Sequence, residues 1–330
     1  MPLLLVLGLA AFSGAVAIRA SDPVVPLIAR DFDVTLTAAA LISSAYSLPY
    51  ALGQPILGPI GDALGKAAVM RACLAVAVVA MGAAWLAPTY ETLFAARMAA
   101  GVAGGGVIPV ALAIIGDRFH YEERQVALAR VLFAAVTGQL LGSVGSGLIG
   151  ERFGWRASFL AAFVISVIAA VAAFFALRPR EGAARKPLRL STAIEGYRQV
   201  FANPLAVVCY STVFAEGILI YGIFPHLAGI FEGRQVGGVR EAGFTVGAFG
   251  LGGIVMTLTV RRMLRTFGQF TMMRIGGLMA GAAFVVVALT LSWQATVAAF
   301  VFLGLGFYMI HNSLQTQATE LAPAARGGDE

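Results

Sequence analysis

Long apolar runs separated by short polar connections make up most of the chain. A helix crosses a bilayer with roughly 20 mostly apolar residues, and ten runs approach or exceed that length. Because most connections are short, we expect consecutive helices to lie antiparallel as neighbours. The pattern predicts an all-α membrane protein with spans at 3–29, 35–59, 67–88, 92–116, 127–149, 156–177, 205–230, 240–260, 272–292 and 295–318.

The composition supports the same class of protein. Hydrophobic residues make up 59% of the chain and charged residues only 12%, with a mean hydropathy of +0.85, whereas soluble domains carry about 25% charged residues. Membrane helices tolerate the 39 glycines and 13 prolines, because small residues allow close helix packing. A water-soluble fold is therefore excluded. No basic residue precedes the first apolar run, so we interpret it as a span rather than a signal peptide.

The longest polar stretch divides the predicted spans into six and four. Residues 1–177 are predicted to form an N-terminal six-helix bundle, and 205–330 an incomplete C-terminal bundle of four helices. Residues 178–204 between them are rich in arginine and are predicted to be a basic linker. Most of the 23 Lys and Arg residues fall on the side of this linker, which predicts a cytoplasmic linker and N-terminus in a bacterial-type inner membrane. The net charge of +6 is then a topogenic signal, and no nucleic-acid partner is needed to explain it.

The turn between the second and third predicted spans carries one acid and one base. Gly58, Asp62, Gly65 and Lys66 follow one another within nine residues between two apolar runs. So short a turn forces the two helices to lie close and antiparallel. Both charges are then expected at one face of the membrane.

Arg97 lies inside the fourth predicted span, four residues before Gly101 on the same helical face. An ionised side chain inside the bilayer costs several kcal/mol unless it faces a cavity or a partner. A role in coupling is one interpretation. The alternative is a structural arginine that extends to the membrane surface.

The first predicted span holds Arg19 and Asp22, three residues apart and able to share a helical face. Pro23 and Pro26 follow, and prolines at these positions free backbone carbonyls and bend a helix around a cavity. Asp22 is therefore a candidate cavity-lining acid that binds protons or a cation. A charge pair at the mouth of the helix is the alternative.

Glu216 lies in the seventh predicted span with no base near it in sequence. Its partner must come from another helix, for example through Arg19. A carboxyl group inside the bilayer is a candidate proton carrier, and a satisfied structural acid is the alternative.

Two polar stripes are candidates for lining a substrate cavity. Tyr46, Tyr50 and Gln54 recur every four residues on the second span, where packing or lipid contact is the alternative. His311, Asn312 and Gln315 form the other stripe, on the tenth span. For these residues the alternative is that they lie at the cytoplasmic end of the helix, where polar side chains are ordinary.

The sequence contains no nucleotide-binding loop, catalytic triad or metal-ligand cluster. The glycines at 104–106 lie inside a predicted span and cannot hold a phosphate as a P-loop does. We therefore expect no enzyme activity, no cofactor and no metal site.

Several of these motifs together resemble the major facilitator superfamily, and in particular its drug:proton antiporter and sugar-efflux branches. The resemblance covers nearly the whole chain. It rests on the Gly58–Lys66 turn, on Leu93 with Arg97 and Gly101, on the Pro23–Pro26 element and on the basic central loop. Gly138, Gly142 and Gly147 also fit the glycine spacing of the antiporter motif, although close helix packing explains them as well. The loop around Gly268 falls where a second copy of the Asp62–Lys66 turn is expected.

The resemblance implies alternating access by two helical bundles, of twelve spans in all. Ten spans are predicted here, and Glu320–Gly327 resembles the loop before an eleventh, so a C-terminal truncation is expected. The implied function is proton-coupled efflux of a small organic solute or drug by a monomer, with coupling through Asp22, Arg97, Glu216 and Arg19 and gating through the Gly58–Lys66 turn. Proton symport or facilitated uptake of a solute such as a sugar, and a non-transporting truncated membrane protein, are the alternatives.

Overall fold

The computed structural model describes residues 3–177, 195, 198 and 200–318. All regular elements in these ranges are helices, as the apolar pattern predicts. Most of the predicted basic linker and the Glu320–Gly327 loop lie outside the described residues.

The described helices correspond to the ten predicted spans. The first span is divided into two helices by a 3₁₀ turn, and the seventh contains a π-helical turn and a second 3₁₀ turn. The longest helix, α11, is interrupted at Gly268 and therefore supplies the eighth and ninth spans. The elements are α1 (Leu3–Arg19), the 3₁₀ turn Asp22–Val24, α2 (Val25–Asp31), α3 (Leu36–Leu64), α4 (Lys66–Trp85), α5 (Tyr90–Arg118), α6 (Tyr121–Phe153), α7 (Trp155–Ala176), α9 (Pro204–Glu216), the π-helix Gly217–Tyr221, the 3₁₀ turn Phe224–His226, α10 (Leu227–Gly233), α11 (Val239–Leu289) and α12 (Trp293–Ala318).

Eight helical segments of the described chain are long and apolar enough to cross a membrane, with all of α11 counted as one. Helix α3 is not among them, although its 29 residues are long enough. It carries Pro49, Pro55 and Pro59 and several serines and tyrosines, which lower its hydropathy. The predicted helical membrane protein is confirmed.

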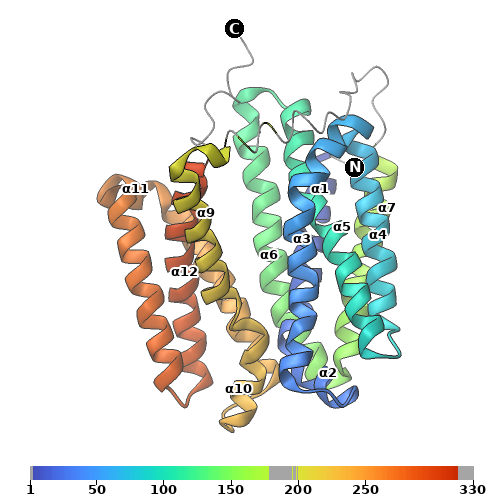
Figure 1. Ribbon diagram of the computed structural model, residues 1–330, viewed down its shortest axis with the longest axis vertical. Helices are drawn as coiled ribbons and strands as arrows, with labels where there is room; N and C mark the ends of the chain where they lie inside the picture. Colours follow the sequence, from blue (N-terminus) through green and yellow to red (C-terminus); the bar gives the residue numbers. More distant parts are fainter. Residues whose placement is uncertain (1–2, 178–194, 196–197, 199, 319–330) are drawn as a thin grey trace. The chain divides into compact units, whose positions relative to one another are not determined.

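The described chain forms two compact units. The first consists of Met1–Leu188 with Pro225–Gly247, and the second of Arg189–Phe224 with Ala248–Glu330. In the first unit, α3 packs against α5, α1 against α6, and α4 against α5 and α7 (Figure 1). A short part of the seventh and eighth spans thus groups with the N-terminal helices.

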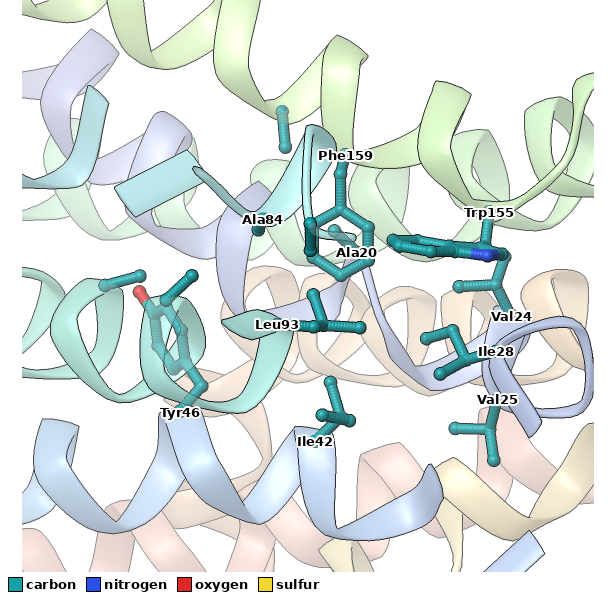
Figure 2. Packing of buried hydrophobic residues seen from close by; sticks show 14 of the residues in the cluster. Ala20, Val24, Val25, Ile28, Ile42, Tyr46, Ala84, Leu93, Trp155 and Phe159 are labelled. Carbon is teal, nitrogen blue, oxygen red and sulfur yellow. The ribbon is translucent and has the colours of Figure 1, made fainter. Parts of the chain in front are cut away.

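An apolar cluster fills the first unit where α1 ends. Leu93 of α5 lies between Ile42 of α3 and Phe159 of α7 (Figure 2), and all three side chains are fully buried. Val24 and Ile28 lie beside Trp155 in the same cluster. Between membrane helices the alternative to such a core is equally apolar lipid, so the cluster stabilises the bundle through close van der Waals packing. This packing positions the helices that carry the polar groups described below.

The glycines of the fifth span pack at two different interfaces. A Cβ on Gly138 would lie 2.6 Å from the carbonyl oxygen of Phe12 in α1, and one on Gly142 would lie 2.9 Å from Cα of Val16. Gly147 instead faces α11, where Cα of Gly243 would lie 2.9 Å from its Cβ. Close helix packing therefore accounts for all three glycines in this conformation.

Three glycines with positive φ each end one helix and begin the next. Their φ and ψ angles are 99° and 121° at Gly65, 81° and 166° at Gly154, and 70° and 168° at Gly268. Non-glycine residues are rare in this region, because their Cβ crowds the backbone. Gly268 shares the positive φ of Gly65 at the place where the sequence predicts a second copy of that turn, although its ψ angle is closer to that of Gly154.

We expect Gly65→Ala to lower the free energy of unfolding by about 1–3 kcal/mol. Because nothing lies within 4 Å of a Cβ at this position, the loss comes from the backbone angle alone. Thermal unfolding in detergent measures it. The matched control is Gly116→Ala in helical α5, where a Cβ also meets nothing within 4 Å and which is expected to be neutral or to stabilise by up to about 1 kcal/mol. Equal unfolding temperatures for the two variants would contradict the prediction.

Candidate functional site

The candidate site begins where the first span is interrupted. Helix α1 ends at Arg19, and the 3₁₀ turn Asp22–Val24 leads into α2. Proline lacks an N–H group, so Pro23 and Pro26 cannot donate backbone hydrogen bonds here. The last four carbonyl groups of any α-helix also lack partners within that helix. The interruption therefore presents backbone oxygen atoms to the neighbouring helices.

Arg97 of α5 binds these oxygen atoms. Its Nη1 donates to the carbonyl oxygen of Ala17 at 2.6 Å, and its Nη2 donates to that of Ile18 at 3.4 Å. Nε donates to the carbonyl oxygen of Ile42 in α3 at 3.3 Å, and Nη2 also donates to Ser21 Oγ at 3.2 Å. The side chain is 0% exposed. Arg97 therefore does not extend to the surface in this structure.

Aromatic rings enclose the same guanidinium group. Its Cζ atom lies 4.5 Å from the ring centre of Tyr46 and 5.7 Å from that of Phe159. A cation over an aromatic face gains about 2 kcal/mol or more when it is desolvated. Carbonyl oxygens around the edge and rings over the face thus compensate the burial of this charge.

A continuous hydrogen-bonded chain connects Arg97 to Asp22. Ser21 Oγ lies 3.1 Å from Ser43 Oγ, and Ser43 Oγ donates to Asp22 Oδ1 at 2.7 Å. Arg19 Nη1 forms an ion pair with Asp22 Oδ2 at 3.1 Å. These five side chains are buried. The chain joins α5, α3 and the interruption in the first span.

Gln139 of α6 extends this network. Its Oε1 accepts from Arg19 Nη2 at 3.0 Å and from Arg19 Nε at 3.2 Å. The network therefore contains two guanidinium groups, Arg19 and Arg97, and one carboxyl group, Asp22. The charge pair predicted in the first span is present, and it lies in the interior of the first unit.

The predicted aromatic stripe of the second span packs onto α5. Tyr50 stacks on Tyr46 with ring centres 6.0 Å apart, and Gly105 lies against the backbone of Tyr50. Tyr46 lines a cavity of about 10 Å³ together with Ser13 and Ser166. That volume holds about one water molecule, so this particular cavity is too small for a solute. Gln54, one turn further along, is half-buried.

Charged residues also meet at the opposite end of α3. Lys66 Nζ lies 2.7 Å from Asp117 Oδ2 at the end of α5 and 3.4 Å from Asp62 Oδ1. Gly65 provides the positive φ that places Lys66 directly after α3, and Gly58 lies in the last two turns of that helix. The predicted pair of charges is therefore a triad of one base and two acids.

In the second unit, the structure brings together two residues that the sequence predicts separately. His311 Nδ1 of α12 lies 3.0 Å from Glu216 Oε2 of α9, and Gln315 Nε2 lies 3.2 Å from His311 Nε2. Asn312 is half-buried next to them in sequence. Glu216 thus has a partner from another helix, as expected, and that partner is His311.

Four residues of these networks were not predicted from the sequence. Ser21 and Ser43 resemble the ordinary serines of membrane helices, which usually bond to their own backbone, as Ser47 does to the carbonyl oxygen of Ser43. A usable signal was present for the other two, Gln139 inside an apolar run and Asp117 beside the basic end of its span.

The apolar helices and the charged networks buried among them define a polytopic helical membrane protein. The chain belongs to the Major Facilitator Superfamily, whose sequence profile matches residues 7–329. The resemblance to the superfamily is thereby confirmed, and the antiporter and sugar-efflux branches stay a prediction.

Several relatives of this chain are transporters. The uncharacterized MFS-type transporter YceJ of Bacillus subtilis (strain 168) is 26% identical over 266 residues, which is 80% of this chain and 67% of YceJ. The inner membrane transport protein YdhP of Escherichia coli (strain K12) is 27% identical over 185 residues, 56% of this chain and 47% of YdhP. With YybF of B. subtilis the match covers 42% of the relative. The chain thus spans about half the length of several of its relatives.

A solved structure has the same fold. It is a bacterial homolog of the human lysosomal transporter Spinster in an inward-facing and unoccupied conformation. The two share a TM-score of 0.70 at 17% identity, over 97% of this chain and 78% of the other.

Proposed function

We propose that this chain is a secondary active transporter that works by alternating access and exports a small organic solute in exchange for protons. Family membership supports transport, and the buried network around Asp22 supports proton coupling. The observation that carries the proposal is an acid held at a helix interruption, with a continuous hydrogen-bonded path to a fully buried arginine. Acidic side chains inside the membrane are rare and usually belong to proton or ion pathways, which is why we assign Asp22 a role in transport.

In the proposed mechanism, Asp22 binds and releases the coupled proton. Its carboxylate accepts from Ser43 and pairs with Arg19. A proton on Oδ2 removes the acceptor for Arg19, which keeps its bonds to Gln139. Ser43 and Ser21 connect Asp22 to Arg97, which binds the carbonyl oxygens where α1 ends. Proton binding at Asp22 can therefore change how the two parts of the first span are held together.

The Asp62–Lys66–Asp117 triad is the proposed gating element, and it lies at the proposed cytoplasmic face together with the N-terminus. We propose that the protein acts as a monomer in a bacterial inner membrane. Its proposed partners are the solute, protons and the surrounding lipid. The cytoplasmic face follows from the loop arginines and lysines.

Flux into proteoliposomes tests the proposed function. Vesicles with an acidic lumen are expected to accumulate one of two probes, the lipophilic cation ethidium or the neutral sugar isopropyl thiogalactoside, because an antiporter exchanges luminal protons for external solute. A symporter would empty such vesicles instead. Accumulation that survives a protonophore would contradict proton coupling.

Asp22→Asn is expected to lower the gradient-driven flux at least tenfold, because the amide is nearly isosteric but binds no proton. The matched control is Asp33→Asn at an exposed position between α2 and α3, which is expected to transport normally. Gradient-driven flux in Asp22→Asn equal to that of the control would exclude Asp22 as the coupling acid.

Asp62→Asn is expected to impair transport severalfold without reducing membrane insertion. The change leaves Lys66 with Asp117 at 2.7 Å and removes the weaker contact at 3.4 Å. Partly exposed ion pairs contribute about 0–1 kcal/mol to stability, so the folded protein persists while the charge balance of the triad changes. Flux normalised to the protein content of the membrane fraction measures the effect. Normal flux would count against a gating role.

A further inference from the structure

A buried acid and a histidine face each other in the second unit. Glu216 is the last residue of α9, and its side chain is 5% exposed, while the side chain of His311 on α12 is 26% exposed. The distance from Glu216 Oε2 to His311 Nδ1 is 3.0 Å. The other oxygen, Glu216 Oε1, is buried and has no hydrogen-bond partner among the described residues. A buried carboxylate with one bonded oxygen is poorly compensated.

Apart from His311, no charged side chain among the described residues of this unit is buried beside this acid. Among the described residues of this unit, the buried thiol of Cys209 donates to the carbonyl oxygen of Leu314, and Tyr221 and Tyr308 are half-buried. With an ionised Glu216 and a neutral His311, the pair carries one net negative charge, and uptake of one proton brings that charge to zero. The other described acidic and basic side chains of the unit are exposed, namely Glu195, Arg198, Arg261, Arg262, Arg265 and Arg274.

Gln315 allows the imidazole ring to exist in two protonation states. Its amide nitrogen lies 3.2 Å from His311 Nε2 and can donate to that atom when the ring is neutral. In that state His311 Nδ1–H donates to Glu216 Oε2. When Nε2 acquires a proton, rotation of the amide by half a turn presents the carbonyl oxygen of Gln315 as the acceptor. Neither state leaves the ring without partners.

The aromatic neighbours hold the ring in place. Phe307 stacks on His311 with centres 4.9 Å apart and planes 16° from parallel. Phe307 also contacts Tyr221, at 5.4 Å between ring centres. Tyr221 ends the π-helix Gly217–Tyr221, which begins directly after Glu216. Glu216 therefore lies directly before a backbone irregularity whose last residue, Tyr221, contacts the same Phe307 ring that stacks on His311. Short π-helical turns of this kind are frequent at functional sites.

We propose that Glu216 and His311 together bind one exchangeable proton, at a site separate from Asp22. A proton from water adds to His311 Nε2 and produces an imidazolium ion, while Nδ1–H remains bonded to the Glu216 carboxylate. The pair changes from one negative charge to none, and no other bond forms or breaks. The site is defined by its own geometry and does not require the proposed efflux direction.

Nitrogen-15 NMR of the full chain labelled at histidine tests the proposal without any solute. In spectra recorded from about pH 8 to about pH 5, His311 should change from a neutral ring protonated at Nδ1 to a doubly protonated ring. Loss of one set of signals in His311→Gln assigns them. The matched control is His226→Gln, at an exposed position, which should remove a different set. A His311 ring that stays in one protonation state over this range would overturn the proposal.

Proton uptake by the purified protein over the same range supplies an independent measurement. The double variant Glu216→Gln with His311→Gln should take up about one proton fewer than the wild type, and a deficit of two or of none would contradict a shared proton. Glu91→Gln at an exposed position should match the wild type. Asp22→Asn should leave the His311 signals unchanged, so failure of the transport proposal and failure of this one are distinguishable. If tetramethylammonium rather than acid changes those signals, the pair is a site for organic cations and the proposal is wrong.

Discussion

Arg97→Lys is expected to lower the free energy of unfolding by about 3–5 kcal/mol and to abolish transport, although the positive charge is kept. The planar guanidinium group donates in several fixed directions, whereas an ammonium group donates from one atom. Lysine therefore cannot donate at once to the four acceptors of Arg97, which are Ser21 Oγ and the carbonyl oxygens of Ala17, Ile18 and Ile42. The carbonyl oxygens at the end of α1 would be left without donors in the interior. Thermal unfolding in detergent and flux in proteoliposomes measure the two losses.

The chain offers a matched control for that substitution. Arg124 also donates to backbone carbonyl oxygens, those of Phe119 at 3.0 Å and Gly116 at 2.6 Å, but it is exposed. Water can replace the lost bonds in Arg124→Lys, so this variant is expected to lose less than about 1 kcal/mol. Equal losses at the two positions would show that burial of Arg97 is not the cause.

Gly101→Val is expected to lower the free energy of unfolding by about 3 kcal/mol or more, which is the upper end of the range typical of overpacked interiors. A Cβ at this position would collide with the carbonyl oxygen of Tyr46, and Cα of Tyr46 would lie 3.1 Å away. These are backbone atoms of α3, which cannot rotate aside, so α3 and α5 would have to separate. Arg97 lies one turn away on the same face of α5, and its bond to Ile42 of α3 would be lost as well.

Gly116→Val on the same helix is the control for Gly101→Val. A Cβ at Gly116 meets nothing within 4 Å, and valine has a higher helix propensity than glycine. The control is therefore expected to unfold at the wild-type temperature or above it. If both variants unfolded at the same temperature, close packing of α3 on α5 could not explain the effect.

The sequence predicted the ten helices because each needs only enough apolar residues to cross a membrane. It also predicted that Pro23 and Pro26 would free carbonyl groups in the first span, which are those of Arg19 and Asp22, four residues before each proline. The carbonyl oxygens that Arg97 and Ser146 bind are instead those of Ala17 and Ala20, which have no partner within the helix because α1 ends at Arg19. The hydroxyl bridge of Ser21 and Ser43 was not predictable. The periodicity of the sequence indicates which face of a helix a serine occupies. Which helix packs against that face is determined by the tertiary packing of the bundle.

The pair in the second unit shows the same limit. Glu216 and His311 lie 95 residues apart in sequence, and each was predicted alone as an ionisable or polar group within a span. The cost of isolated charge in a bilayer predicts that such an acid has a partner. It does not tell which of several polar side chains that partner is, because α9 and α12 meet only in the folded chain.

The glycine turns at Gly65, Gly154 and Gly268 have a consequence for how the chain enters a membrane. Each of these glycines is the only residue between two successive helices, so the two helices must lie close together when they enter the lipid. We expect the pairs α3 with α4 and α6 with α7, and the two parts of α11, each to enter the lipid as one hairpin. The unit of insertion at these three places is then two helices rather than one.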